Sequence, residues 1–240
     1  MRGMWDIHCH ILPGVDDGAK DMEMAKALLR KEMQDGVQNI ILTPHYRRQM
    51  FEPEMSLIYS TYEQLRQETE DLELNLYIGC EYHANMDMAE NLNAGKRPTL
   101  AGSRYVLCEF SDGDLAAYIT ERTYQLLANG YIPVLAHIER YRALTKDFSL
   151  IDDLVERGCC MQVNAGSILG EDGFFTRRFC KKLIDYDLLH FIGSDAHNLT
   201  DRTPRMGECA AYLEKKYGEN YARQILQRNP GKIMCNTPAI

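Results

Sequence analysis

The chain has 240 residues, 45% of them hydrophobic and 26% charged, with a formal net charge of −8. This composition is that of an ordinary globular protein, and the acidic balance argues against a nucleic-acid-binding surface, which needs a basic footprint. No apolar run approaches the ~18 residues that span a bilayer and no charged-then-apolar leader precedes the first predicted strand, so we expect a cytoplasmic protein without membrane insertion.

Short apolar runs alternate with longer stretches of helical periodicity along the chain. The predicted strands are 5–11, 37–43, 74–81, 105–110, 132–137, 160–164 and 190–193. The predicted helices are 21–34, 54–72, 86–94, 115–128, 149–157, 174–184, 204–217 and 221–227. Asp21 is the expected N-cap of the first helix, and Gly36 its expected end. Seven strand–helix units without a linker or repeat predict an α/β fold, a closed or nearly closed parallel barrel forming a single domain over 1–240.

The first predicted strand contains Asp6-Ile7-His8-Cys9-His10. Because side chains alternate along a strand, Asp6, His8 and His10 are expected on one face. Two imidazoles at this spacing can reach one metal ion, and a carboxylate on the same face can orient one ring. Taken alone, the His-x-His pattern is equally compatible with two ordinary strand histidines.

Other polar side chains follow later strands at the point where each strand ends. In parallel barrels these carboxyl ends meet at one rim, where the chemistry gathers. Mixed imidazole and carboxylate ligands without thiolates suit Mn, Fe or Zn, and so many groups suit two or three ions bridged by carboxylates. The predicted metal ligands are His8, His10, Asp17, His45, Glu81, Glu109, His137, Asp195 and His197.

Some of these segments have a plainer explanation when taken singly. Asp17 lies in an Asp-Asp-Gly run that also fits a turn before a helix, and His45 fits a solvated loop histidine. Glu81 and Glu109 end apolar runs, where a carboxylate is costly to bury unless it is paired or metal-bound. His137 ends the buried run 132–136, where a solvated position is less expected.

Arginines follow three of the ligand loops, and their planar guanidinium groups match phosphate oxygens. Arg140 follows His137, and Arg202 follows the Asp195 turn. We interpret Arg140 as functional. Arg47, Arg48 and Arg205 fit surface positions equally well.

The two remaining histidines and three of the eight cysteines are expected not to bind metal. His83 is expected at the rim or surface, and His190 in the structure of its strand. Cys9, Cys80 and Cys108 each precede a predicted ligand, so alternation makes them small buried hydrophobes behind the site. No C-x-x-C pair indicates a zinc knuckle, and no cysteine has an arginine six positions later, as a thiolate phosphate-binding loop would require.

Several of these motifs resemble those of the polymerase-and-histidinol-phosphatase (PHP) superfamily. They are Asp6-Ile7-His8-Cys9-His10, Thr43-Pro44-His45, Gly79-Cys80-Glu81, His137-Ile138-Glu139-Arg140-Tyr141 and Ser194-Asp195-Ala196-His197-Asn198. The run 12–19 and the segment 137–141 are similar to the bacterial tyrosine-phosphatase branch, the CpsB, CapC and YwqE type. The similarity extends from about residue 4 to about residue 232 in the expected order and spacing.

The resemblance implies a distorted (β/α)7 barrel with three metals, Mn²⁺ first among candidates that include Fe, Zn, Co and Mg. The first metal would be held by His8, His10, Glu81 and Asp195, the second by Glu81, Glu109 and His137, and the third by Asp17, His45 and His197. Arg140 would bind the phosphoryl group, assisted by Arg202. The implied partner is the phosphotyrosine-bearing tail of a cognate tyrosine autokinase in capsule or exopolysaccharide synthesis, and the implied assembly is a homo-oligomer.

Two other functions stay open at this point. A PHP phosphoesterase acting on a small phosphate monoester, such as histidinol phosphate, would use the same metals. A non-catalytic binding module that docks on a kinase or polymerase is the alternative from another class, and the complete ligand set argues against it.

Overall fold

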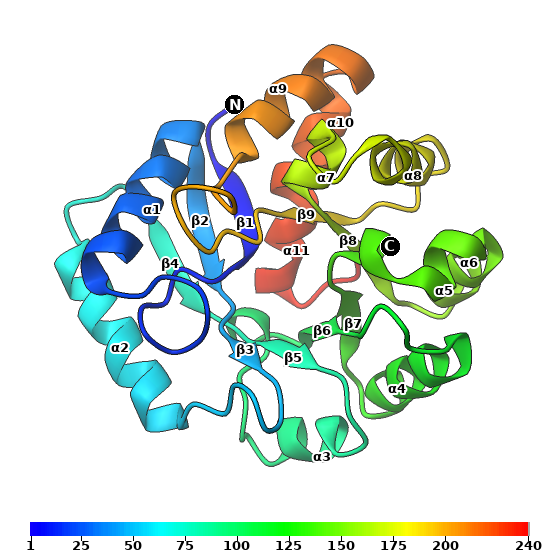
Figure 1. Ribbon diagram of the computed structural model, residues 1–240, viewed down its shortest axis with the longest axis horizontal. Coiled ribbons are helices and arrows are strands. Elements are labelled where there is room, and N and C mark those ends of the chain that lie inside the picture. The colour runs from blue at the N-terminus through cyan, green and yellow to red at the C-terminus, as the bar shows by residue number, and fades with distance from the viewer. Residues whose placement is uncertain (240) are drawn as a thin grey trace.

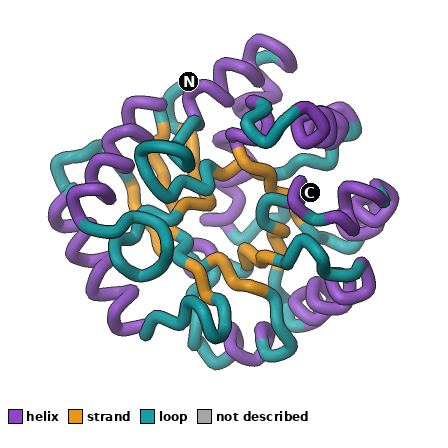
Figure 2. Tube along the Cα trace, viewed as in Figure 1, coloured by secondary structure: helices purple, strands orange, loops and turns teal. Residues whose placement is uncertain are grey.

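Parallel strands form the centre of the molecule and helices surround them, as the computed structural model of residues 1–239 shows (Figure 1). The strands form one sheet of order β1-β2-β4 and a second of order β3-β5-β6-β7-β8-β9, all paired in parallel. Figure 2 shows the strands as a central ring with most helices outside it, and α11 lies within the ring in this view. The strands are β1 Met4–Cys9, β2 Val37–Leu42, β3 His45–Tyr46, β4 Asn75–Ile78, β5 Glu81–His83, β6 Tyr105–Glu109, β7 Ile132–Leu135, β8 Cys160–Asn164 and β9 Phe191–Gly193.

The described residues form nine strands where seven were predicted, because one predicted strand is interrupted and one short strand was not predicted. The predicted strand 74–81 breaks between β4 and β5 at Gly79 and Cys80, and the unpredicted β3 follows β2 after a break at Thr43 and Pro44. Pro44 lacks the N–H that a continued ladder needs. Past each break the strand changes its partners, so that β3 and β5 join the larger sheet. The two interruptions distort the barrel on the side where His45 and Glu81 begin the new strands.

Backbone hydrogen bonds join the segment after the first strand, β1, to the segment after the last strand, β9. The backbone N–H of Asp195 donates to the carbonyl of His8, and that of His10 donates to the carbonyl of Ala196, at 2.8 and 2.9 Å. The segment after β9 is thereby held against the segment after β1.

Helices cover the outside of the strands, mostly where the periodicity predicts them. They are α1 Met22–Asp35, α2 Met55–Glu68, α3 Met88–Asn93, η1 Leu100–Gly102, α4 Ala116–Ala128, η2 Ile138–Arg140, α5 Arg142–Lys146, α6 Phe148–Glu156, α7 Ala165–Leu169, α8 Phe174–Asp185, α9 Met206–Tyr217, α10 Glu219–Arg223, η3 Gln224–Arg228 and α11 Asn229–Cys235. Within residues 1–239, none is long and apolar enough to cross a membrane.

Local signals set the ends of α1 as predicted. The Asp21 carboxylate accepts a 2.8 Å hydrogen bond from the Met24 N–H, and Gly36 ends the helix with φ 95°, a conformation that glycine adopts without steric cost. The predicted helix 54–72 was too long, because α2 ends at Glu68 and the hydroxyl of Thr69 bonds back to the Leu65 carbonyl.

The last predicted helix was too short. After α10 the chain continues through the π-helical segment η3 into α11, which contains Pro230 in its first turn. A proline is tolerated there because the first N–H groups of a helix have no intrahelical partner. The short helices α5 and α7 were not predicted.

Two sets of buried apolar side chains pack on the two faces of the strands. Trp5, Ile7, Leu107, Val134 and Phe191 belong to the set enclosed by the ring, together with Ile233 of α11. A larger set, which includes most of the buried helix residues, packs between the strands and the outer helices. The functional side chains therefore project from strands that are fixed on both faces.

Candidate metal centre

The segments after β1 and β9 place the first polar side chains at the rim. His8 and His10 are fully buried, with their Nε2 atoms 3.3 Å apart. Asp195, buried on the neighbouring segment, has its Oδ1 3.7 Å from His8 Nε2 and 3.5 Å from His10 Nε2. Two ligands on one ion, with bonds of about 2.1 Å, lie roughly 3 to 3.4 Å apart, so the imidazole spacing is that of a shared ion.

Glu81, the first residue of β5, lies at the centre of the group. Its Oε1 is 3.3 Å from His8 Nε2 and 2.8 Å from His137 Nε2. Its Oε2 is 3.2 Å from His10 Nε2 and 2.9 Å from His45 Nδ1. The carboxylate of a fully buried glutamate thus faces four imidazoles, two through each oxygen, which is the arrangement of a bridging ligand.

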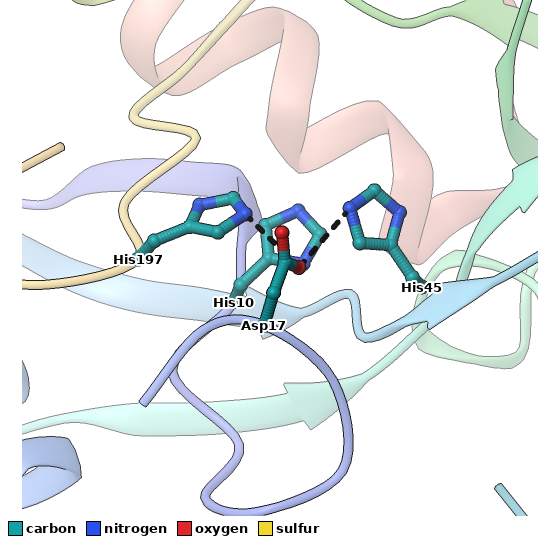
Figure 3. A group of neighbouring side chains, drawn as sticks. All are labelled: His10, Asp17, His45 and His197. Atoms are coloured by element: carbon teal, nitrogen blue, oxygen red, sulfur yellow. Dashed lines mark ion pairs between the residues drawn. The ribbon is translucent and has the colours of Figure 1, made fainter. Parts of the chain in front are cut away.

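Asp17 brings a third group together from the loop that follows β1. Figure 3 shows its carboxylate between His45 and His197, with His10 beside it. The Asp17 Oδ1 lies 3.6 Å from the Nε2 of His45 and 3.6 Å from that of His197. The loop packs closely against His10, because a Cβ added at Gly18 would clash with the His10 backbone. The Asp-Asp-Gly run is therefore part of the site and not only a turn before α1.

The structure brings all nine predicted ligands to one rim. Their donor atoms fall into four overlapping groups: His10, Asp17, His45 and His197; His8, Glu81 and His137; His8, His10 and Asp195; and His45, Glu81 and Glu109. The overlap joins the groups into one cluster. His10 lies with both the first and third predicted ligand sets, so the distribution of ligands among individual ions stays a prediction.

Unpartnered buried atoms test whether metals fit this cluster. Among the described residues, His45 Nδ1, Glu81 Oε2, Glu109 Oε2 and His197 Nε2 are buried and make no hydrogen bond. His45 Nδ1 and Glu81 Oε2 are close, but their geometry is not that of a hydrogen bond. Buried polar atoms without partners are costly. Divalent cations bound by these nitrogen and oxygen donors would remove that cost. The residues of the cluster therefore fit divalent metal ions.

The second ring nitrogen of four histidines is held from outside the cluster. His8 Nδ1 lies 3.1 Å from Gln162 Oε1, and His10 Nδ1 lies 2.8 Å from Asp16 Oδ2. His197 Nδ1 lies 2.9 Å from the Asp195 carbonyl, and His137 Nδ1 lies 3.4 Å from the Tyr141 hydroxyl. A ring that donates from Nδ1 presents the Nε2 lone pair to the cluster, as metal-binding histidines usually do.

Strand β8 supplies amides that position ligands from three other strands. The fully buried Gln162 accepts a 2.8 Å hydrogen bond from the backbone N–H of His137, besides its contact with His8. Its Nε2 donates to Asn164 Oδ1 at 3.0 Å, and Asn164 Nδ2 donates to Asp195 Oδ2 at 2.8 Å. Asn164 is the last residue of the predicted strand 160–164, whose end was expected at this rim, whereas Gln162 was missed because its only signal was an amide inside an apolar strand.

Asp6 does not have the predicted role. Its carboxylate accepts hydrogen bonds from the backbone N–H and hydroxyl of Ser194, at 2.9 and 2.6 Å, and from the His8 N–H. Alternation fails because the pairing of β1 is irregular between Asp6 and Cys9. Asp6 therefore ties the Asp195 loop to β1, while Asp16, which the sequence reasoning did not single out, orients a ring.

Two arginines contact the cluster through the Asp195 carboxylate. Arg140 Nη2 donates to Asp195 Oδ2, and Arg202 Nη2 donates to Asp195 Oδ1, both at 2.9 Å. Arg140 also lines a cavity of about 220 Å³ that contains Arg47, Glu109 and His137. Arg48 pairs with Asp87, and Arg205 pairs with Glu171 and Glu208, which assigns these two to the surface.

The pKa values of Glu81 and Glu109 are shifted in opposite directions. Burial alone would raise the pKa of Glu81, but His8 and His45 hold it well below its usual value. Burial and the neighbouring Glu81 raise the pKa of Glu109 to about 7. Although burial and the adjacent His45 oppose its protonation, Asp16 and Glu81 raise the pKa of His10 to about 9. The cluster without cations therefore holds protons that bound cations would displace.

Two ligand positions have left-handed backbone conformations that side chains with a Cβ rarely adopt. His137 has φ 29° and ψ 56°, and Asp195 has φ 53°. Both follow the last residue of a buried strand within two positions. Such conformations cost roughly 1–3 kcal/mol each and persist where the surrounding contacts hold them, typically at functional sites.

The residues expected outside the site lie outside it. Half-buried His83 is 3.1 Å from the Ser111 hydroxyl, and His190 accepts a 3.1 Å hydrogen bond from the Met161 N–H. Cys9, Cys80 and Cys108 are buried as predicted, and burial raises the pKa of each thiol.

Comparison with known proteins identifies the family. The family model for capsular polysaccharide synthesis, CpsB/CapC, matches residues 4–235. The chain belongs to the CpsB/CapC family. This family member is 36% identical over 240 residues to the tyrosine-protein phosphatase CpsB of Streptococcus pneumoniae, covering 97% of this chain and 99% of CpsB. It is 36% identical over 221 residues to the tyrosine-protein phosphatase YwqE of Bacillus subtilis, covering 90% of this chain and 85% of YwqE.

A solved structure confirms the predicted fold class of this CpsB/CapC family member. The similar chain comes from crystal structures of YwqE from Bacillus subtilis and CpsB from Streptococcus pneumoniae, described as metal-dependent tyrosine phosphatases. It superposes with a TM-score of 0.91 at 33% identity, over 98% of this chain and 95% of that chain. The distorted α/β barrel and the family resemblance are therefore both confirmed.

Proposed function

We propose that this protein is a metal-dependent protein-tyrosine phosphatase of the cytoplasm. Its substrate would be phosphotyrosine on a bacterial tyrosine autokinase, with a role in regulating capsule or exopolysaccharide synthesis and with Mn²⁺ as the cofactor. The observation that carries the proposal is the junction between the nine-residue cluster and the cavity that holds Arg47 and Arg140. The names of the similar proteins, CpsB and YwqE, support the substrate class.

The cluster would hold two or three divalent cations through five imidazoles and four carboxylates. When bound, such ions would supply Lewis-acid charge and a water whose pKa is lowered to about 7. Glu81 would share its two oxygens between ions, and Gln162 and Asp16 would keep His8 and His10 in the tautomer that binds.

Arg140 and Arg47 would bind the phosphoryl oxygens. Both guanidinium groups line the cavity beside Glu109 and His137, where charge on the equatorial oxygens needs neutralising. Arg140 would exchange its contact with Asp195 for the substrate, and Arg202 would keep Asp195 paired. Phe110 and Tyr141 also line this cavity, although both side chains are almost fully buried.

The leaving group would depart with little help from a general acid. A phenolate has a conjugate acid near pKa 10 and leaves more readily than an alkoxide. A cysteine nucleophile is not needed, and Cys9, Cys80 and Cys108 are too deeply buried to serve as one.

The decisive assay strips the protein of metal with a chelator and restores single metals. We expect no turnover of a phosphotyrosine peptide after stripping, and recovery with Mn²⁺ exceeding that with Zn²⁺, Fe²⁺, Co²⁺ or Mg²⁺. Histidinol phosphate and a phosphoserine peptide, assayed side by side, test the substrate class. Undiminished activity in stripped protein would refute the metal chemistry, and faster turnover of histidinol phosphate would refute the substrate.

The partner and the assembly are proposed on the family resemblance. Dephosphorylation of the cognate kinase tail in a reconstituted mixture tests the partner. Light scattering coupled to size-exclusion chromatography tests for a homo-oligomer, and a monomeric mass at micromolar concentration would contradict it.

A further inference from the structure

One face of α8 carries aromatic and basic side chains that the proposed chemistry does not use. Phe175, Arg178, Phe179, Lys182 and Tyr186 recur at helical spacing and line a cavity of about 710 Å³. The opposite wall includes Thr145, and the cavity reaches Glu139. This cavity, the α8 groove, is bounded by α8, by Thr145 of α5 and by Glu139 of η2. Figure 1 shows α8 on the same side of the molecule as α5.

The aromatic rings of the α8 groove are unusually exposed. Phe175 is 83% exposed, the adjacent Phe174 71% and Tyr186 63%. Single exposed apolar side chains are normal, but several on one short helix indicate a contact surface.

The groove is basic on an otherwise acidic protein. α8 carries Arg177, Arg178, Lys181 and Lys182 against a single acidic residue, Asp185. Lys181 pairs with Asp185 at 2.8 Å, and Arg177 lies over the Tyr212 ring on the side of α9. Of the charged side chains that line the groove, Arg178 and Lys182 then remain against the buried Glu139, so the groove keeps a net positive charge. Lys182 Nζ lies 3.7 Å from the centre of the Phe148 ring, so cation and aromatic surface are presented together.

The α8 groove adjoins the candidate metal centre. Glu139 lines the groove, and the next residue in sequence, Arg140, lines the cavity proposed to bind phosphate. The turn η2 that carries both residues packs against α8. A peptide with one side chain at Arg140 can therefore continue towards Phe175 and Arg178.

We propose that the α8 groove binds a second phosphotyrosine of the same substrate chain. A phosphotyrosine combines a charge of about −1.5 to −2 with an aromatic ring, and the groove offers guanidinium and ammonium groups beside exposed rings. The inference rests on the proposed function and extends it, since two linked contacts raise the local concentration of each phosphotyrosine at its site.

An anionic membrane surface is the other occupant that basic and aromatic side chains could serve. The shape of the groove favours the peptide, because its basic and aromatic side chains, although exposed, line a cavity that can take up a side chain, whereas a membrane surface offers no side chain to fill it.

Peptides with non-hydrolysable phosphonate analogues of phosphotyrosine provide the test. One peptide carries a single analogue, and the others carry two, three to six residues apart, about 10–20 Å in an extended chain. Their inhibition constants are measured against p-nitrophenyl phosphate turnover by the metal-loaded protein. We expect the best doubly modified peptide to inhibit the wild-type protein at least tenfold more strongly than the single one.

The variant combining Phe175→Ala, Arg178→Ala and Lys182→Ala should lose this preference to within twofold while turning over p-nitrophenyl phosphate as before. The matched control combines Tyr124→Ala, Lys215→Ala and Lys216→Ala, which removes the same numbers of rings and charges from α4 and α9. The control should retain the preference. A wild-type protein without the preference, or an α8 variant that keeps it, would overturn the proposal. Loss of anionic vesicle binding in an α8 variant that keeps the peptide preference would assign the groove to membranes.

Failure of the proposed function is distinguishable from failure of the groove. If the wild-type protein turns over neither phosphotyrosine peptide nor p-nitrophenyl phosphate, the function is refuted. Fluorescence anisotropy with labelled peptides then tests the groove without any turnover. Tighter binding of the doubly modified peptide that the α8 variant loses would still support it, and equal binding by both proteins would overturn it.

Discussion

Replacing Gln162 by methionine would test whether β8 positions the metal centre without touching a metal. Methionine has a similar length and replaces the amide by an apolar thioether, so the strand stays packed while its hydrogen bonds are lost. The substitution removes the acceptor shared by the His137 N–H and His8 Nδ1, and the donor to Asn164 Oδ1.

The expected magnitudes follow from those contacts. Each buried polar group left without a partner costs about 1–3 kcal/mol. Because His8 and Asn164 can shift to relieve part of this cost, we expect the free energy of unfolding of the metal-free protein to fall by about 3 kcal/mol. His8 also loses the contact that fixes its tautomer, and loss of such a partner typically weakens metal affinity about 10–100-fold.

Two measurements separate positioning from folding. Chemical denaturation of the metal-free protein gives the stability loss, and competition with a fluorescent chelator gives the metal affinity of the folded protein below its unfolding transition. Gln67→Met, on the exposed face of α2, is the matched control and should change neither quantity. A Gln162→Met protein that is destabilised but binds metal with wild-type affinity would show that the amide network serves folding alone.

Three further predictions concern the metal dependence of turnover, the arginines that bind phosphate and the pH dependence of stability. Alkylation of the metal-loaded protein should leave turnover unchanged while chelation abolishes it, because all cysteines except Cys235 are buried; inactivation by alkylation would contradict this. Arg140→Ala should lower kcat/KM about 100-fold or more and Arg47→Ala about tenfold, whereas Arg48→Ala, the surface control, should have no effect; steady-state kinetics test the order. Burial lowers the pKa of His190 to about 4 from 6.5, so the unfolded chain binds the extra proton and stability falls as the pH drops from about 6.5 to 4. His190→Asn keeps an acceptor for the Met161 N–H and should reduce this fall by about 3 kcal/mol in denaturation at the two pH values; an unchanged fall would exclude His190 as its source.

The sequence predicted most of the fold because its signals were local. Apolar runs separated by helical periodicity located the seven strands, and Asp21 and Gly36 set the ends of α1. The short strand β3 and the break in the predicted strand 74–81 follow from the change of sheet partners, which depends on contacts distant in sequence. The prediction ended the second strand before Pro44 but gave no strand beyond it, and it passed over Gly79 in the third strand.

The candidate site was predictable wherever one residue both ends a strand and carries a donor atom. Glu81, Glu109 and His137 were found by that rule, and the structure places them together. Gln162 could not be found in this way, since its role depends on the neighbouring strand. Asp6 was wrongly assigned because alternation assumes a regular strand, and β1 is irregular before Cys9.

The backbone at His137 and Asp195 sets a limit on engineering this enzyme for heat resistance. Glycine or asparagine would adopt these φ angles with less resistance than histidine or aspartate. A library of variants selected only for a high melting temperature should therefore accumulate inactive variants with substitutions at residues 137 and 195. Selection for thermal stability must be coupled to a screen for turnover, because the residues that relieve the backbone strain at these positions are not the residues that support catalysis.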